Sequence, residues 1–215
     1  MTPARTALVA GALACALLPG CKIVPNPDPE SDAAAAPMDD DQRMALQAAQ
    51  IFDERLPAYV QDHVVDAATL RAALADGLDT AGTAHGIRPG SEGSPWNFVL
   101  RAEGQVVEAD RESRAASMVL DSNGDGQGDL TVQLGPVIRG TALRDALDFL
   151  IFTDFRDQIE FAKLARALND QAHQRLALPE GNLVGRSFTV EGAMTLPSVD
   201  EPWVVVPIAL SEVAP

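Results

Sequence analysis

The sequence predicts an α+β fold: a small OB-like antiparallel β-barrel with an inserted helical subdomain and N-terminal helices. Three observations lead to this prediction. Residues 38–86 repeat apolar side chains at helical spacing, and residues 96–134 switch to short, partly alternating segments rich in β-forming residues. Residues 141–176 return to the helical period before two final strands. Strands, a helical stretch and further strands in this order are typical of a curled sheet or barrel with helices inserted.

The N-terminal helical region divides into two predicted helices. The acidic run 39–41 favours a helix start, because negative charge stabilises the N-terminal end of the helix dipole. Pro57 stops or kinks this helix. A second helix begins after Asp66, and Gly82 and Gly86 end it. The apolar positions of the two helices are Met44, Ala48, Ile51, Phe52, Leu56, Leu70, Ala73, Leu74 and Leu78.

The predicted strands are short and separated by turn-forming residues. Gly104 and the cluster 123–126 supply turns that give three or four consecutive strands in meander order. The helical region 141–176 follows, with Leu143, Leu147, Leu150, Ile159, Ala162 and Ala165 on its buried stripe and a helix restart at Thr153–Asp154. The predicted strands cover residues 96–100, 105–109, 115–120, 130–134, 187–196 and 203–210.

The first residues have the plan of a secretory signal that ends in a lipid attachment site. Arg5 precedes the apolar stretch 6–18, and Cys21 follows small residues. The apolar stretch gives roughly 20 Å of helix, short of the roughly 30 Å hydrocarbon core of a membrane. We therefore predict a signal peptide over 1–20, lipidation of Cys21 and a flexible, proline-rich tether over 21–37. A secreted protein without lipid is the alternative.

Charge and cysteine content narrow the possible functions. The chain has 31 acidic and 16 basic residues, a net charge of −15, which disfavours binding to nucleic acid or a polybasic contact with the membrane. Cys15 leaves with the signal peptide and Cys21 would carry lipid, so no disulfide holds the fold. We expect one globular domain over 38–215, with its barrel over about 94–140 and 183–212, held in the periplasm on the cell membrane or outer membrane.

An aspartate-rich loop at residues 121–129 is the sharpest local pattern. Oxygen-bearing side chains stand at alternate positions around glycines, as in loops that bind Ca²⁺ between strands. Val132 stands where an EF-hand would have a bidentate glutamate. The alternative is a polar hairpin tip, where Asp, Asn and Gly are favoured by turn geometry alone. Calcium is the only cofactor suggested, and its ligands would be Asp121, Asn123, Asp125, Gln127 and Asp129.

A second constellation lies at residues 135–145, where a strand ends and glycines turn the chain. Thr141 is placed to cap a helix, and Arg139 and Arg144 are placed to clamp an anion or sugar hydroxyls. The alternative is internal: an arginine pairs with Asp145, Asp154 or Asp157 and fastens the helix to the barrel.

The search for catalytic signatures is mostly negative. His63, His85 and His173 are scattered, without the close spacing of metal ligands. Asp145, Asp157 and Glu160 would serve a glycoside hydrolase only if the fold set two of them about 5 to 9.5 Å apart. Trp96 and Trp203 have the chemistry to stack on sugar rings, but strand positions are more often core positions.

Four blocks of the sequence carry a resemblance to a known family. Residues 21–25, 94–98, 135–145 and 152–160 resemble the DUF2291 family of predicted periplasmic lipoproteins. Asp157 stands where the family pattern has Asn. The resemblance implies an OB-like barrel with a helical subdomain and an association with sugar-type ABC uptake systems. It supplies no catalytic residues.

The sequence therefore predicts a non-enzymatic, lipid-anchored periplasmic accessory or binding protein of a carbohydrate ABC uptake system. Its partners would be the membrane, transporter components or a small sugar-like ligand. A calcium-stabilised structural or envelope-interaction lipoprotein and a periplasmic glycoside hydrolase are the alternatives. The predicted ligand or partner surface comprises Arg139, Thr141, Arg144, Asp145, Asp157 and Gln158.

Overall fold

A computed structural model describes residues 38–90 and 93–213 of the chain. The predicted signal peptide, the lipidation site Cys21 and the tether lie outside the described residues. Met38–Pro215 form one compact unit. Within the described residues, no helix has the length and apolar character needed to cross a membrane.

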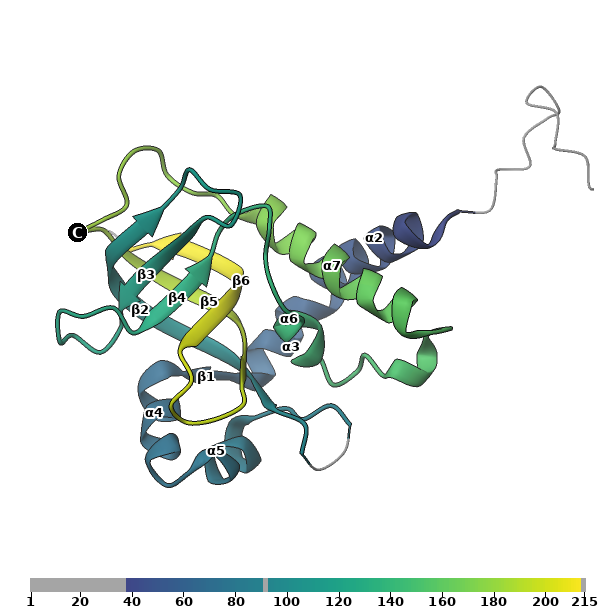
Figure 1. Cartoon of the computed structure of the whole chain (residues 1–215), viewed down its shortest axis with the longest axis horizontal. Coiled ribbons are helices and arrows are strands. Elements are labelled where there is room, and N and C mark those ends of the chain that lie inside the picture. The colour runs from purple at the N-terminus through teal and green to yellow at the C-terminus, as the bar shows by residue number, and fades with distance from the viewer. Residues whose placement is uncertain (1–37, 91–92, 214–215) are drawn as a thin grey trace, which may run out of the picture. The chain divides into compact units, whose positions relative to one another are not determined.

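Six strands form one mixed sheet (Figure 1). Their order is β1-β2-β3-β4-β6-β5, and β5 also pairs with β2, so the pairings among β2 to β6 run around a ring. The pairs β1–β2 and β4–β6 are parallel, so the predicted wholly antiparallel arrangement is wrong there. Strand β6 is antiparallel to β5 on one side and parallel to β4 on the other, so it runs in the same direction as β4. The strands are β1 Val64–Asp66, β2 Trp96–Asp110, β3 Ser117–Asp121, β4 Leu130–Gln133, β5 Ser187–Leu196 and β6 Trp203–Glu212.

Strand β2 is one long strand where the sequence predicted two strands and a turn. Gly104 lies inside β2, opposite Phe188 of β5, and a Cβ atom at this position would come within 2.4 Å of the Asp121 carbonyl oxygen. The glycine therefore permits a close approach of two backbones. An irregularity between Val106 and Glu108 shifts the register of β2 against β3.

The helices form two groups around the sheet. α2 and α7 lie side by side, and α4 and α5 lie together (Figure 1). Gly77, with a φ of 107°, separates α4 from α5, so the predicted second helix is two helices. Gly86 ends the later one as expected, but Gly82 lies inside it, so the prediction that Gly82 ends the helix is wrong. The helices are α2 Asp40–Gln50, α3 Leu56–His63, α4 Ala67–Ala75, α5 Leu78–His85, α6 Ala142–Asp145 and α7 Gln158–Arg175, with a π-helical stretch η2 Ile51–Arg55 and a 3₁₀ turn η3 Phe152–Asp154.

Two helix boundaries differ from the prediction for local reasons. Pro57 does not stop the first helix: the Leu56 N–H bonds to the Ile51 carbonyl across the π-helical stretch, and α3 continues to His63. The long helical region after β4 is broken, and its main helix α7 begins at Gln158 instead of Thr153–Asp154. The Asp157 carboxylate sets this start, because it accepts the Glu160 N–H at 2.8 Å.

Two apolar cores lie on opposite faces of the strands. Phe98 and Leu100 of β2 point into the core enclosed by the strands, whereas Val99 points into the core beneath α2, α3, α6 and α7. This alternation follows from the two-residue period of a strand. From the predicted stripe, Leu143, Leu147, Leu150 and Ala165 are buried, but Ile159 is 68% exposed and Ala162 is exposed.

Candidate functional site

Three of the sequence blocks noted above meet at one pocket of about 510 Å³. Ser94, Pro95 and Asn97 come from the start of β2 and the loop before it. Arg144 and Asp145 come from α6, and residues 150–153 and Phe161 complete the opposite side. Because these segments are distant in the sequence, only the fold brings them together. We call this cavity the α6 pocket.

Asn97 fixes the wall of the α6 pocket that belongs to the sheet. Its backbone exchanges two hydrogen bonds with Ile87, of 2.7 and 2.8 Å, which hold Ile87 against the start of β2. Its side chain is almost fully buried, and its Oδ1 accepts the Thr195 hydroxyl at 2.6 Å. Its Nδ2 reaches the Ile87 and Pro95 carbonyls only at 3.4 Å.

Arg144 and Asp145 form an ion pair at the opposite wall. The Arg144 Nε donates to Asp145 Oδ1 at 2.8 Å, and the Thr141 hydroxyl donates to Asp145 Oδ2 at 2.5 Å. The guanidinium also lies 3.9 Å from the centre of the Phe161 ring on α7. Arg144 therefore pairs with Asp145, as the internal alternative expected, but both residues belong to α6, so this pair does not itself fasten the helix to the sheet. The Thr141 hydroxyl bonds to Asp145 and makes no cap on the α6 backbone, so its predicted capping bond is wrong.

Tyr59 supports α6 from behind, and sequence reasoning missed it. Its hydroxyl donates to the Ala146 carbonyl at 2.9 Å and accepts the Asp148 N–H at 3.2 Å. Burial raises the pKa of Tyr59 to about 12. The one available signal was that Tyr59 is the only tyrosine in the chain.

Arg139, also predicted for the ligand surface, lies outside the pocket lining and is exposed. Its backbone N–H donates to Gln133 Oε1 at 2.8 Å. The loop around it is fastened to α7, because the Asn169 amide donates to the Gly140 carbonyl at 3.1 Å and the His173 ring lies 2.9 Å from the Leu134 carbonyl.

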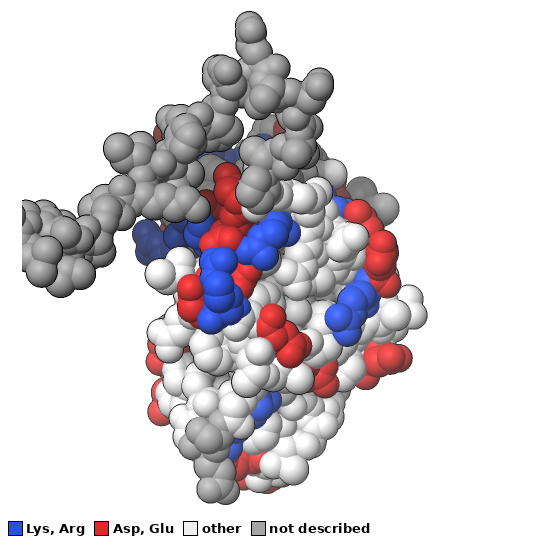
Figure 2. Space-filling model, turned by 90° about the vertical axis from the view of Figure 1, so that its right-hand side faces the viewer, with Lys and Arg blue, Asp and Glu red and all other residues white. Residues whose placement is uncertain are grey.

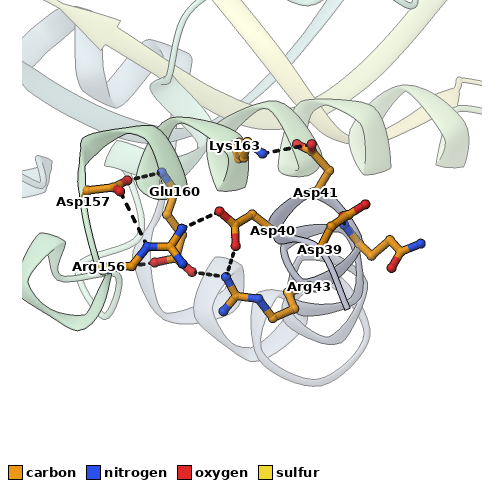
Figure 3. A network of polar contacts seen from close by, with 9 residues as sticks. Asp39, Asp40, Asp41, Arg43, Arg156, Asp157, Glu160 and Lys163 are labelled. Carbon is orange, nitrogen blue, oxygen red and sulfur yellow. Dashed lines mark hydrogen bonds and ion pairs between the residues drawn. The ribbon is translucent and has the colours of Figure 1, made fainter. Parts of the chain in front are cut away.

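Asp157 and Gln158 lie instead at the start of α7, apart from the pocket lining. This end of α7 meets the start of α2 in a cluster of charged side chains (Figure 3). Gln158 is exposed there. The predicted surface therefore divides into three places: Thr141, Arg144 and Asp145 stay together, while Arg139 and the pair Asp157 and Gln158 lie elsewhere.

The charged cluster is built by mutual neutralisation. Glu160, only 5% exposed, accepts the Arg156 N–H and an Arg43 N–H, both at 2.7 Å. Asp40 pairs with Arg43 and Arg156, and Lys163 bonds to Asp41 at 2.9 Å. Figure 2 shows the same interleaving at the surface, where Lys and Arg lie directly beside Asp and Glu. The helix-start cluster comprises Asp40, Asp41, Arg43, Arg156, Asp157, Glu160 and Lys163.

The hydrogen bonds of the helix-start cluster lower the pKa of its carboxyl groups. The Arg156 N–H lowers the pKa of Glu160, and the Glu160 N–H lowers that of Asp157. The Arg156 side chain has the same effect on the pKa of Asp40. A glycosidase general acid needs a raised pKa, so the directions at Asp157 and Glu160 disfavour that role.

Most side-chain contacts of the aspartate loop are made within the loop itself. Asp121 accepts the N–H groups of Gly124 and Gly126 at 2.7 and 2.8 Å, and these bonds lower the pKa of its carboxyl group. Asp125 accepts the Gln127 N–H at 2.8 Å. Asp129 turns toward Arg71 on α4 at 2.7 Å. These contacts are those of a polar hairpin tip, and the calcium site stays a prediction.

The histidines and tryptophans have structural surroundings. His63 stacks on the Tyr59 ring with centroids 3.9 Å apart. Across residues 38–90 and 93–213, no three His, Cys, Asp or Glu side chains gather closely enough to hold a metal ion. Trp203 is in the core, and Trp96 packs over Gly82 and donates to Asp79 at 3.1 Å. The core interpretation therefore holds for Trp203.

Comparison with known proteins identifies the fold and then the family. An OB-fold protein from Thermotoga maritima, known from its crystal structure, matches with a TM-score of 0.60 at 18% identity, over 79% of this chain and 97% of that chain. This likeness shows the fold alone, a mixed α+β protein with an OB-fold neighbour. The family model described as predicted periplasmic lipoprotein (DUF2291) matches residues 11–211, so the chain belongs to that family. No curated protein matches the chain.

Proposed function

We propose that this protein is a lipid-anchored accessory or binding protein of the periplasm that serves a carbohydrate ABC uptake system. The observation that supports the proposal most is the α6 pocket, where blocks 94–98, 135–145 and 152–160 contribute side chains to one cavity. A pocket with an apolar wall and a few buried polar groups is the usual form of a small-molecule site.

The lipid anchor is the first part of the proposal to test. When cells that express the full chain are grown with a radiolabelled fatty acid, the protein should become labelled, and Cys21→Ser should remove the label. Cys15→Ser is the matched control and should keep it. A label that persists in Cys21→Ser would show that lipid is attached at another residue, which would contradict the proposed anchor at Cys21.

Binding is tested by two arginine variants from the same block. Arg144→Ala should abolish sugar binding or crosslinking to a transporter subunit in the periplasm, because Arg144 lines the pocket and orders Asp145. Arg139→Ala should leave both unchanged, because Arg139 lies outside the lining. Circular dichroism must show that each variant is folded. Unfolding of Arg144→Ala would favour a purely structural role for that arginine, and equal behaviour of both variants would contradict the proposal.

The glycoside hydrolase and the calcium-stabilised lipoprotein are each tested by a separate experiment. Turnover of glycosides that disappears in Asp157→Asn or Glu160→Gln would support a hydrolase. Melting that falls on chelation and recovers with Ca²⁺ would support the calcium-stabilised lipoprotein.

A further inference from the structure

The lining of the α6 pocket is partly apolar and partly polar, and together the two parts define a class of ligand. This inference rests on the proposed function, because it concerns the same pocket. The apolar part includes Ile151 and Phe152, which remain 55% and 45% exposed. The polar part includes Asn97 from the sheet and Arg144 and Asp145 from the opposite side. A ligand that fits must therefore present an apolar face and a hydrogen-bonding edge.

The charges around the pocket are balanced, which disfavours an anionic ligand. Arg144 is paired with Asp145, and Arg88, which also lines the pocket, is paired with Asp79 at 3.0 Å. Asp148 adds an exposed carboxylate to the lining. An anion entering here would meet no uncompensated cation, in a chain whose net charge is −15.

Two buried N–H donors at the pocket lack good partners. The Arg88 Nε is buried and has no hydrogen-bond partner within the described residues. The Asn97 side chain is 1% exposed, and its Nδ2 makes only the two contacts of 3.4 Å. Buried donors without short bonds are costly, so an acceptor oxygen on a ligand would be favoured beside them.

One aromatic ring is placed to receive the apolar face of a ligand. The Arg144 guanidinium covers a face of Phe161. Phe152 packs against Phe161 at a ring separation of 5.6 Å and an angle of 68°, so the two rings meet edge to face. Phe152 is 45% exposed and therefore offers an apolar surface at the pocket.

We infer that the α6 pocket binds an uncharged cyclic sugar and discriminates against acidic sugars. The C–H face of the sugar ring lies on Phe152, and its hydroxyl groups bond to Asn97, Arg88 and Asp145. The Asp148 carboxylate, together with the balanced arginines, excludes sugars that carry a carboxylate or phosphate.

Calorimetric titration of the full chain in detergent tests the ligand class. The probes are glucose, galactose and ribose, each against an acidic counterpart: glucuronate, galacturonate and ribose 5-phosphate. At least one neutral sugar should bind, and its acidic counterpart should bind at least about tenfold more weakly. Phe152→Ala should weaken the neutral sugar by about tenfold. Ile159→Ala, at an exposed apolar position outside the lining, is the control and should bind normally.

A charge variant tests the reason for the discrimination. Asp148→Asn should narrow the preference for the neutral sugar, whereas Asp154→Asn, an exposed acid nearby that does not line the pocket, should not. Preferred binding of an acidic sugar, or equal effects of Phe152→Ala and Ile159→Ala, would overturn this inference and leave the proposed function standing. If no sugar binds while transporter subunits still crosslink to the chain, the inference again fails alone. The loss of both overturns the proposed function as well.

Discussion

The α6 pocket and the helix-start cluster are built from the same kinds of side chain but use them differently. In the cluster, Asp40, Asp157 and Glu160 are bonded to arginines or to the N–H groups of a helix start. In the pocket, the Arg144–Asp145 pair borders a cavity, and donors of Arg88 and Asn97 remain poorly bonded. The cluster therefore joins two helices, whereas the pocket leaves polar groups poorly bonded, which is what the proposed ligand site requires. Contact between arginine and aspartate alone does not distinguish these two uses.

The largest expected effect comes from removing the apolar support of the pocket. Leu143 belongs to α6 and is fully buried, so Leu143→Ala should lower the free energy of unfolding by about 3 kcal/mol, or roughly 6 to 12 °C in melting temperature. Leu164→Ala, at an equally buried position on α7, should cost a similar amount. The two should differ in ligand binding measured where both are folded. Loss in Leu143→Ala alone would tie function to the pocket, and equal loss in both would contradict the contrast.

The helix-start cluster should set the response to acid. Because the folded-state pKa values of Asp40, Asp157 and Glu160 are lowered, their contribution is complete above the unfolded values near 4 and is lost as pH falls below them. Melting temperature should therefore fall as pH drops below about 4 and passes through the lowered folded-state pKa values. In Arg156→Gln the drop should be shallower, because the pKa of Asp40 moves back toward its ordinary range, while the backbone N–H bonds to Asp157 and Glu160 remain. An unchanged acid profile in this variant would show that the cluster does not control acid stability.

Tyr59 connects the two regions. It lies on α3, which continues the helical stretch that α2 begins at the helix-start cluster, and its hydroxyl bonds to the chain just after α6. Tyr59→Phe should cost about 1 to 2 kcal/mol through two lost hydrogen bonds. The folded pKa of about 12 lies above the ordinary value near 10, so the folded state holds its proton longer than the unfolded state. Stability should therefore decline as pH rises through 10, and Tyr59→Phe should lack that part of the decline. Denaturant unfolding at pH 8 and pH 11 measures both effects.

Sequence patterns predicted the order of strands and helices well, because those depend on local periodicity. They did not predict what depends on distant neighbours. Gly104 was predicted to be a turn residue. In the structure the backbone of Asp121 on β3 approaches it closely, and this contact explains the glycine. The short parallel strand β1 was missed, because three residues carry no periodicity of their own. Arg139 and Asp157 were grouped with Arg144, but the loop before α6 holds Arg139 outside the pocket lining, and η3 separates α6 from the start of α7, where Asp157 lies.

The smallest expected effect lies in the aspartate loop, where the turn and calcium interpretations diverge. Asp121 accepts two backbone N–H groups, whereas Asp125 accepts one at the exposed tip. If turn geometry alone selects these residues, Asp121→Ala should lower the melting temperature slightly, Asp125→Ala should lower it less, and Ca²⁺ should change neither value. A calcium site predicts the opposite pattern, in which both variants resemble the parent in chelator and fall behind it when Ca²⁺ is added. Thermal melts of the parent and the two variants, each with chelator and with Ca²⁺, separate the turn interpretation from the calcium interpretation. A bound cation would replace the N–H donors that now hold the Asp121 carboxylate.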